Sequence, residues 1–580
     1  MILRVRQALH RRWLRFHRTP FGCLSRVFIG RMFYGGSEPG VDGLDLGIGV
    51  IVLLLAMPGL LASLLMFEKY GSLIRFLRGD GVFDPFTATL PDEYFFIALS
   101  MFVTGAAALW RWDSIFLDRR DYMNLAPLPI SLRNIFFANL CAMSVLAGVF
   151  MLVVNAASLF FFPVAVAGSQ NSFSLLLRYA AGHTVAVFAA SLFSFWFVLA
   201  AAGLMMTLLS PTVFRGLSIV VRFGMAIGLL LLLVSSVTMP QLLSEEFLRS
   251  HHTAALLPPL SFVSIARMVW GRGGEQFVAE MTQGALGAIL VVLFTSLTAY
   301  TLSFRKAFMR IPETPDAILW RRQSFSFLSL LRSPNIPMAP QQCASIRFAV
   351  RTLLRSDIHL QVWSGFVAIG LVGAAVALSF APSLKSVVSG STPSEEFLAV
   401  PLILGYCLVI GIRLAFDIPA DLRANWIFRL WLSNHRDGPR PIARCVLLIF
   451  SVLLLAPVVF VMTLAFWGWI AALLHIAMLS VCIIALIELS LCDFRKIPFT
   501  CSYPPFKSGS GVVAVAYLFG FIVFTTYIAE MEYWCLAAPW RAAWFVPLFA
   551  VVIAGLRMYR SRMLEMDKTL IFEEVPDTLF

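Results

Sequence analysis

Long apolar stretches dominate this sequence and constrain its fold more than any other feature. A helix that crosses the hydrocarbon core of a bilayer needs about 20 predominantly apolar residues. About twelve such windows occur along the 580 residues. They are residues 46–66, 94–112, 134–162, 180–209, 217–239, 282–302, 362–381, 397–416, 443–466, 469–490, 511–529 and 542–558. Because a segment in lipid must satisfy its own backbone hydrogen bonds, each window is expected to be helical. The sequence therefore predicts an all-α polytopic membrane protein of about 12 transmembrane helices.

The composition agrees with membrane spans and argues against a soluble nucleic-acid-binding protein. Apolar residues make up 59% of the chain and charged residues 13%, against about 45–50% and 25% in soluble domains. A net charge of +13 would suggest nucleic acid as the partner of a soluble chain. Here an excess of Lys and Arg in cytoplasmic loops explains the same charge, so the expected surroundings are a lipid bilayer and nucleic acid is not expected as a partner.

The distribution of basic residues predicts the orientation of the spans. If the N-terminus is cytoplasmic, the inner segments carry roughly four fifths of the 45 Lys and Arg residues, as the positive-inside rule requires. The same bias holds at each pair of adjacent loops. We therefore expect a multi-pass protein of the plasma (inner) membrane with both termini cytoplasmic.

The order of the segments divides the chain into two similar halves, which predicts two pseudo-repeated six-helix bundles. In each half, a basic amphipathic lead-in precedes six spans, and a charged loop follows the second span. The predicted parts are a cytoplasmic amphipathic segment (1–45), the first bundle (46–302), a cytoplasmic connector containing the second lead-in (303–361), the second bundle (362–558) and a cytoplasmic tail (559–580).

Several short features qualify this picture. Trp467-Gly468-Trp469 separates two adjacent windows and predicts a tight outer turn. The stretch from Leu256 to Trp270 is apolar but too short to span, so a re-entrant or interfacial outer helix is expected there. Glu488 lies near the inner end of its window, and His183 and His475 lie deeper in theirs. Each is either an interfacial or packed polar side chain or part of a proton relay.

A charged stretch between the second and third windows has the features of a cytoplasmic docking element. Pro127 and Pro129 disfavour helix in the residues before them, and Ser131 is placed to cap the next helix. The result is a short charged segment, a stiff break and a re-entry into the membrane. The candidate docking residues are Asp118, Arg119, Arg120, Asp121, Pro127, Pro129, Ser131 and Arg133.

A weaker counterpart occupies the equivalent position in the second half. It also combines acidic, basic and aromatic residues before an apolar entry, but it lacks the Pro-x-Pro-x-Ser pattern. Its candidate docking residues are Asp417, Asp421, Arg423, Trp426 and Arg429.

The stretch from Pro127 to Ile135 resembles a loop of the permease subunits of ABC-2-type exporters. It reads Pro-Leu-Pro-Ile-Ser-Leu-Arg-Asn-Ile, and many bacterial members of that family carry Pro-Leu-Pro-[Ile/Leu]-Ser-x-Arg-x-Ile there. The resemblance implies six-span units, an amphipathic helix before the first span and a cytoplasmic coupling helix between the second and third spans. It also implies a short outer helix before the sixth span, where Leu256 to Trp270 lies.

The resemblance further implies a partner that supplies the energy for transport. No GxxxxGK[S/T] motif occurs in the chain, so ATP would be bound and hydrolysed by a separate ABC ATPase subunit. One chain with two bundles would pair with two copies of it. The chain itself is then not expected to be an enzyme, and we assign it no catalytic, cofactor-binding or metal-binding residue.

Three alternatives remain open at this point. Major-facilitator secondary transporters also have a 6+6 layout with a basic central loop, and Asp118-Arg119-Arg120 matches the middle of their loop motif without its glycines. A polytopic membrane enzyme would need convergent polar groups at one membrane face, and His251-His252 with Glu245-Glu246 is one such cluster. A membrane scaffold without transport activity is the third.

Overall fold

The computed structural model describes residues 19–34, 56–66, 89–112, 115, 123–125, 127–167, 173–238, 257–272, 276–310, 340–380, 394–420, 428, 440–492, 494–501 and 510–566. The structure is 91% helical without strands in these ranges, so the fold is all-α. Ten helices in them are long and apolar enough to cross a membrane, and Ala56–Met66 is a shorter apolar helix within the first predicted window. The chain is therefore a polytopic helical membrane protein.

The longest apolar run, Arg440–Ser490, explains part of the difference between ten helices and twelve windows. Its 51 residues would form a continuous helix of roughly 75 Å, more than twice the thickness of a hydrocarbon core. Gly468 interrupts it with φ 81° and ψ 176°, a conformation open to glycine because it has no Cβ. The predicted break between the ninth and tenth windows is confirmed. The rest of the difference is the first window, of which only residues 56–66 are described.

The chain forms two compact units, Met1–Arg322 and Gln323–Phe580. The boundary falls inside the predicted connector, 303–361. Each unit is described separately below.

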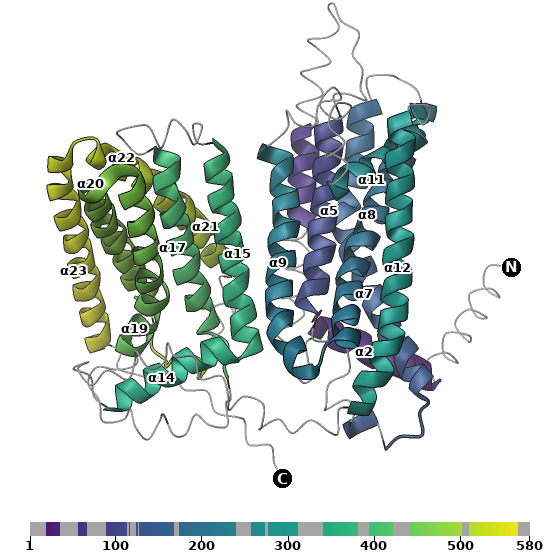
Figure 1. Cartoon of the computed structure of the whole chain (residues 1–580), viewed down its shortest axis with the longest axis horizontal. Helices are drawn as coiled ribbons and strands as arrows, with labels where there is room; N and C mark the ends of the chain where they lie inside the picture. The colour runs from purple at the N-terminus through teal and green to yellow at the C-terminus, as the bar shows by residue number, and fades with distance from the viewer. Residues whose placement is uncertain are drawn as a thin grey trace, which may run out of the picture. The chain divides into compact units, whose positions relative to one another are not determined.

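The first unit is built around two central helices. Its helices are α2 (Pro20–Tyr34), α5 (Leu90–Trp110), α7 (Leu132–Ala167), α8 (Phe173–Leu208), α9 (Pro211–Thr238), α11 (Pro258–Arg267), η4 (Met268–Arg272) and α12 (Gln276–Arg310). Helix α5 is surrounded by α7, α8 and α9, and α8 also packs against α12 (Figure 1). Most of the apolar window of α5 is buried inside the unit, whereas only 6% of the α9 window is fully buried.

The short outer helix predicted near 256–270 is present as α11. It packs against α5, α8 and α12, and side chains such as Leu260, Phe262 and Ala266 are buried. The indole N–H of Trp270 donates to the Tyr179 carbonyl of α8 (3.4 Å). These contacts place α11 within the bundle.

The second unit is built around α17, whose apolar window is 67% buried. Its helices are α14 (Pro340–Arg355), α15 (Asp357–Phe380), α17 (Glu395–Ala415), α19 (Arg440–Phe450), α20 (Val452–Ser490), α21 (Ser510–Ile522), η7 (Val523–Tyr527), α22 (Ile528–Leu536), η8 (Pro539–Arg541) and α23 (Ala542–Met566). Helix α17 packs against α15 along most of its length, and also against α20 and α22.

Each unit has a short helix at one end of its bundle. Helix α14 lies in the predicted second lead-in, whereas the arginines on which the first lead-in was predicted, residues 4–18, lie outside the described residues. In the first unit, α2 buries Leu24 and Phe28 against the end of α7. In the second, α14 crosses the bundle end (Figure 1). It buries Ile346, Val350 and Leu353 in the core, and its arginines are exposed. The alternation of apolar and basic residues therefore decides which face of each helix meets the bundle.

Candidate functional site

The segment from Pro127 to Arg133 presents an exposed, sharply bent surface in the first unit. Pro127, Pro129 and Arg133 are exposed, and the apolar side chain of Leu128 is 47% exposed. The Leu128 N–H donates to the Leu125 carbonyl (3.2 Å), which forms a turn before α7 begins.

Ser131 caps α7, as its position predicts. Its hydroxyl oxygen accepts a hydrogen bond from the backbone N–H of Asn134 (3.3 Å), the third residue of the helix. A cap of this kind contributes about 1 kcal/mol to helix stability. The predicted capping role is confirmed.

The inner side of the segment is anchored in the core of the first unit. Leu125 and Ile130 pack against a buried cluster that contains Phe28 of α2 and Ile135 of α7. Movement of the segment would therefore displace both helices. The four charged residues that precede it in the predicted docking stretch lie outside the described residues: Asp118, Arg119, Arg120 and Asp121.

Asp417, predicted for the second docking loop, forms ion pairs within its own unit. Its carboxylate lies 2.9 and 3.0 Å from Arg413 Nη1 and 2.7 Å from Lys496 Nζ. The Asp417 side chain is only 11% exposed, so these bonds use most of its acceptor capacity. The remaining residues of that prediction lie outside the described part of the chain: Asp421, Arg423, Trp426 and Arg429.

The loop after α17 interlocks with the loop after α20. The Phe499 N–H donates to the Phe416 carbonyl (3.2 Å), and the Ala420 N–H donates to the Phe499 carbonyl (2.8 Å). Phe499 has φ 67°, a left-handed conformation that costs a non-glycine residue about 1–2 kcal/mol. Burial of its ring against His359 and Phe416 offsets that cost.

Lys496 joins these two loops. Its ammonium group donates to the Cys501 carbonyl (2.9 Å) as well as to Asp417. Burial lowers the pKa of Lys496, and the adjacent Asp417 carboxylate opposes that shift. Paired in this way, the buried ammonium stabilises the loops instead of remaining an uncompensated charge.

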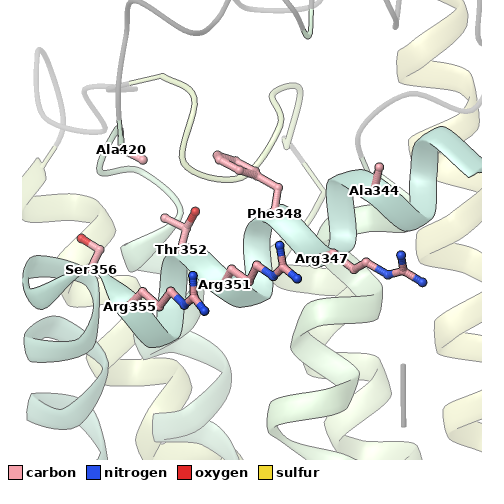
Figure 2. Close-up of a pocket in the computed structure, with 8 residues that line it drawn as sticks. All are labelled: Ala344, Arg347, Phe348, Arg351, Thr352, Arg355, Ser356 and Ala420. Carbon is pink, nitrogen blue, oxygen red and sulfur yellow. The ribbon is translucent and has the colours of Figure 1, made fainter. Parts of the chain in front are cut away.

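A groove with a volume of about 600 Å³ runs along α14 (Figure 2). Arg347, Arg351 and Arg355 line it, and their guanidinium groups lie along the same side of the helix. Phe348 and the loop residue Ala420 contribute uncharged parts of its wall. None of its lining residues is acidic.

A carboxylate and a histidine are fully buried together in the first unit. Nδ1 of His183 on α8 lies 3.1 and 3.0 Å from the two carboxylate oxygens of Glu93 on α5, and Nε2 lies 3.2 Å from Ser158 Oγ on α7. Ser158 in turn hydrogen-bonds the Asn155 carbonyl (3.1 Å). The pair is thus hydrogen-bonded on both ring nitrogens of His183, as buried polar groups in an apolar interior require.

Polar side chains continue from this pair across the three helices. The Asn155 amide donates to Ser100 Oγ on α5 (2.7 Å), and Ser100 hydrogen-bonds Ser191 on α8. All of these side chains are buried. Such interhelical bonds fix the packing of helices whose outer surfaces are equally apolar.

The second unit contains another buried His–carboxylate pair. Nδ1 of His475 on α20 lies 2.5 Å from Glu532 Oε1 on α22, and both side chains are at most 2% exposed. His183 and His475 lie on the fourth predicted span of their respective halves. Their acidic partners differ, because Glu93 comes from the second span of its half and Glu532 from the fifth.

Glu488 of α20 is a buried ion-pair centre. Its carboxylate is 2% exposed and lies within 2.9–3.1 Å of Arg444, Arg557 and Arg560. Three guanidinium groups from α19 and α23 thus converge on one carboxylate. In the described ranges, no cluster of three or more His, Cys, Asp or Glu side chains could hold a metal ion.

Reasoning from sequence missed Glu93 and Glu532. Both lie just outside the predicted windows, 94–112 and 511–529, and were assigned to outer loops. The helices continue beyond those windows, since α5 begins at Leu90 and α22 ends at Leu536. An acidic residue within one turn of a window, with a histidine inside another window, was the available signal.

Together, the helices and their buried ionic groups define a polytopic membrane protein in which a mainly apolar core encloses hydrogen-bonded and ion-paired side chains in each unit. No family model, no curated protein and no solved structure matches the chain.

Proposed function

We propose that the chain is the membrane-spanning permease subunit of an ABC-type exporter, driven by ATP hydrolysis on a separate ATPase subunit. The observation that carries the proposal is the exposed Pro127–Arg133 surface, which is capped by Ser131 and anchored to α2 and α7. A docked ATPase that closed on ATP would push this surface. The Pro-x-Pro turn would pass the motion into α7, because a stiff joint does not absorb it.

The division into two units, each with an amphipathic helix at the bundle end, also supports the proposal. Two ATPase copies would then engage one chain. We propose the inner membrane as its location, with both termini cytoplasmic, and an unidentified substrate.

The experiment tests docking at Leu128. A photo-crosslinking residue at this position in the full-length chain is expected to capture a protein that also labels with 8-azido-ATP. Leu128→Asp should reduce that association at least about tenfold, because burying an unpaired charge in an interface costs several kcal/mol. The control is Leu208→Asp, at a leucine on the end of α8 that is more exposed than Leu128 (78% against 47%). The proposal fails if no ATP-binding protein is captured, or if both substitutions have the same effect.

Proton-coupled secondary transport is a second candidate, favoured by the two buried His–carboxylate pairs. Such pairs inside a membrane bundle mark proton pathways in many transporters. Transport by the reconstituted protein distinguishes the secondary transporter from the ABC permease. A proton gradient alone would energise a secondary transporter, whereas an ABC permease would need its ATPase and ATP.

A further inference from the structure

We propose that the groove along α14 binds the phosphate of an anionic phospholipid headgroup. This inference goes beyond the proposed transport activity and does not depend on it. Three arginines spaced four residues apart form the binding surface: Arg347, Arg351 and Arg355.

The spacing of the arginines suits phosphate groups. Residues four apart on a helix are separated by about 6 Å along its axis, so the backbone positions of the three arginines extend over about 12 Å of α14. Their guanidinium groups lie on one side of the helix (Figure 2). Each guanidinium offers a planar fork of N–H donors that matches phosphate oxygens. Thr352 adds a hydroxyl group in the same groove.

The charge of the groove is not neutralised within the described residues. No carboxylate there lies within ion-pair distance of Arg347, Arg351 or Arg355. Asp417 is in the loop that supplies Ala420 to the groove, but its carboxylate is already paired with Arg413 and Lys496. Among the side chains that the structure describes, the three positive charges therefore have no paired acid that an incoming anion would have to displace.

The position of α14 selects a lipid as the source of that anion. The apolar face of the helix is buried against the bundle, and only Ser356 separates α14 from α15. The apolar span begins at Ile358, so Arg355 lies within one helical turn of the hydrocarbon boundary. Phospholipid headgroups lie at that depth, and basic pockets beside spans bind anionic headgroups.

The size of the groove agrees with this ligand. Its volume of about 600 Å³ lies within the ordinary range for small-molecule sites, about 300–1,000 Å³. Phe348 lies in the same groove, with its ring 5.0 Å from that of Phe428. It supplies an apolar surface beside the charged one, as the junction of headgroup and acyl chain requires.

The test measures lipid retention by the full-length protein. Purified protein in a mild detergent is titrated with phosphatidylglycerol or phosphatidylcholine, and bound lipid is counted by native mass spectrometry. We expect preferential retention of phosphatidylglycerol. The triple substitution Arg347→Gln, Arg351→Gln and Arg355→Gln should weaken it at least about tenfold, since each basic residue near a membrane surface contributes about fivefold in affinity.

Control variants distinguish lipid binding at the groove from a general effect of the positive charge of the protein. The substitutions Arg26→Gln, Arg178→Gln and Arg562→Gln remove the same charge from exposed positions elsewhere and should leave retention unchanged. Replacing the three groove arginines with lysine keeps the charge but removes the planar set of guanidinium N–H donors. We therefore expect phosphatidylglycerol retention to fall by a few fold. If the glutamine variant does not fold, the phosphatidylglycerol retention of the lysine variant tests the proposal in its place.

Several outcomes would overturn the proposal. One is full retention of phosphatidylglycerol by the glutamine variant, and another is an equal loss in the control. Displacement of the lipid by millimolar inorganic phosphate would make the groove a site for small anions. If the glutamine variant instead keeps its lipid and loses a protein partner, the groove is a protein docking surface.

Discussion

Buried ionisable side chains are the most informative residues of this protein. Glu93 and His183 have no exposed surface, and Glu488 is held by three arginines. Removing one member of such a group leaves the others without compensation in a low-dielectric interior, which costs more than the intact pair contributes. Each group therefore ties together helices that are distant in the sequence.

Substitution at Glu93 tests this coupling. Glu93→Leu is expected to lower the free energy of unfolding by about 3 kcal/mol, because His183 loses its partner. The double substitution Glu93→Leu and His183→Leu should cost at least about 1 kcal/mol less than the sum of the two single ones. Thermal unfolding of the purified protein provides the measurement.

Glu395→Leu is the control for this cycle. Like Glu93, Glu395 lies in the first turn of its helix, but its side chain is exposed, so a change within about 0.5 kcal/mol is expected. Additive effects at Glu93 and His183 would show that the pair is not coupled.

At the level of helices, close approach in the second unit depends on residues without a side chain. A Cβ on Gly411 of α17 would lie 2.6 Å from the Cβ of Phe366 on α15, so the two helices could not keep their separation. Small residues allow such contacts between membrane helices, where apolar burial alone does not drive association. The pairing of α15 with α17 thus depends on a glycine inside an apolar run.

Gly411→Ala should destabilise the second unit by about 1–3 kcal/mol, the usual cost of overpacking a close contact. On α15, Gly365→Ala is the matched control. A Cβ there would meet nothing within 4 Å, and alanine is the better helix former by about 1 kcal/mol. The comparison is between the thermal midpoints of the two variants. Equal midpoints would contradict the packing argument.

At the scale of the whole molecule, two compact units follow one another along a single chain. Both have a lead-in helix, apolar spans and a buried His–carboxylate pair, while their acidic residues come from different spans. The predicted orientation would place the ends of the bundles that carry α2 and α14 in the cytoplasm. That end of each bundle also carries the described part of its predicted docking segment, Pro127–Arg133 in the first unit and Asp417 in the second.

Cysteine labelling tests this orientation. All nine cysteines are free, and Cys23 of α2 is the exposed one. A membrane-impermeant maleimide should label Cys23 only after the cells are permeabilised. With Cys23→Ser as background, Ala537→Cys in the exposed turn after α22 should be labelled in intact cells. The opposite pattern would reverse the predicted topology.

The sequence by itself determined the all-α membrane class, the break at Gly468, the amphipathic helix α14 and the Ser131 cap. These properties depend on neighbours in the sequence: hydropathy over one span, the periodicity of a helix face, or a hydroxyl three residues from an N–H. The tertiary structure alone decided which ionisable groups pair. Glu93 reaches His183, Asp417 reaches Lys496, and Glu532 reaches His475 only because helices distant in the sequence pack together. The cost of leaving a buried charge unpaired then selects these partners, and no local pattern records them.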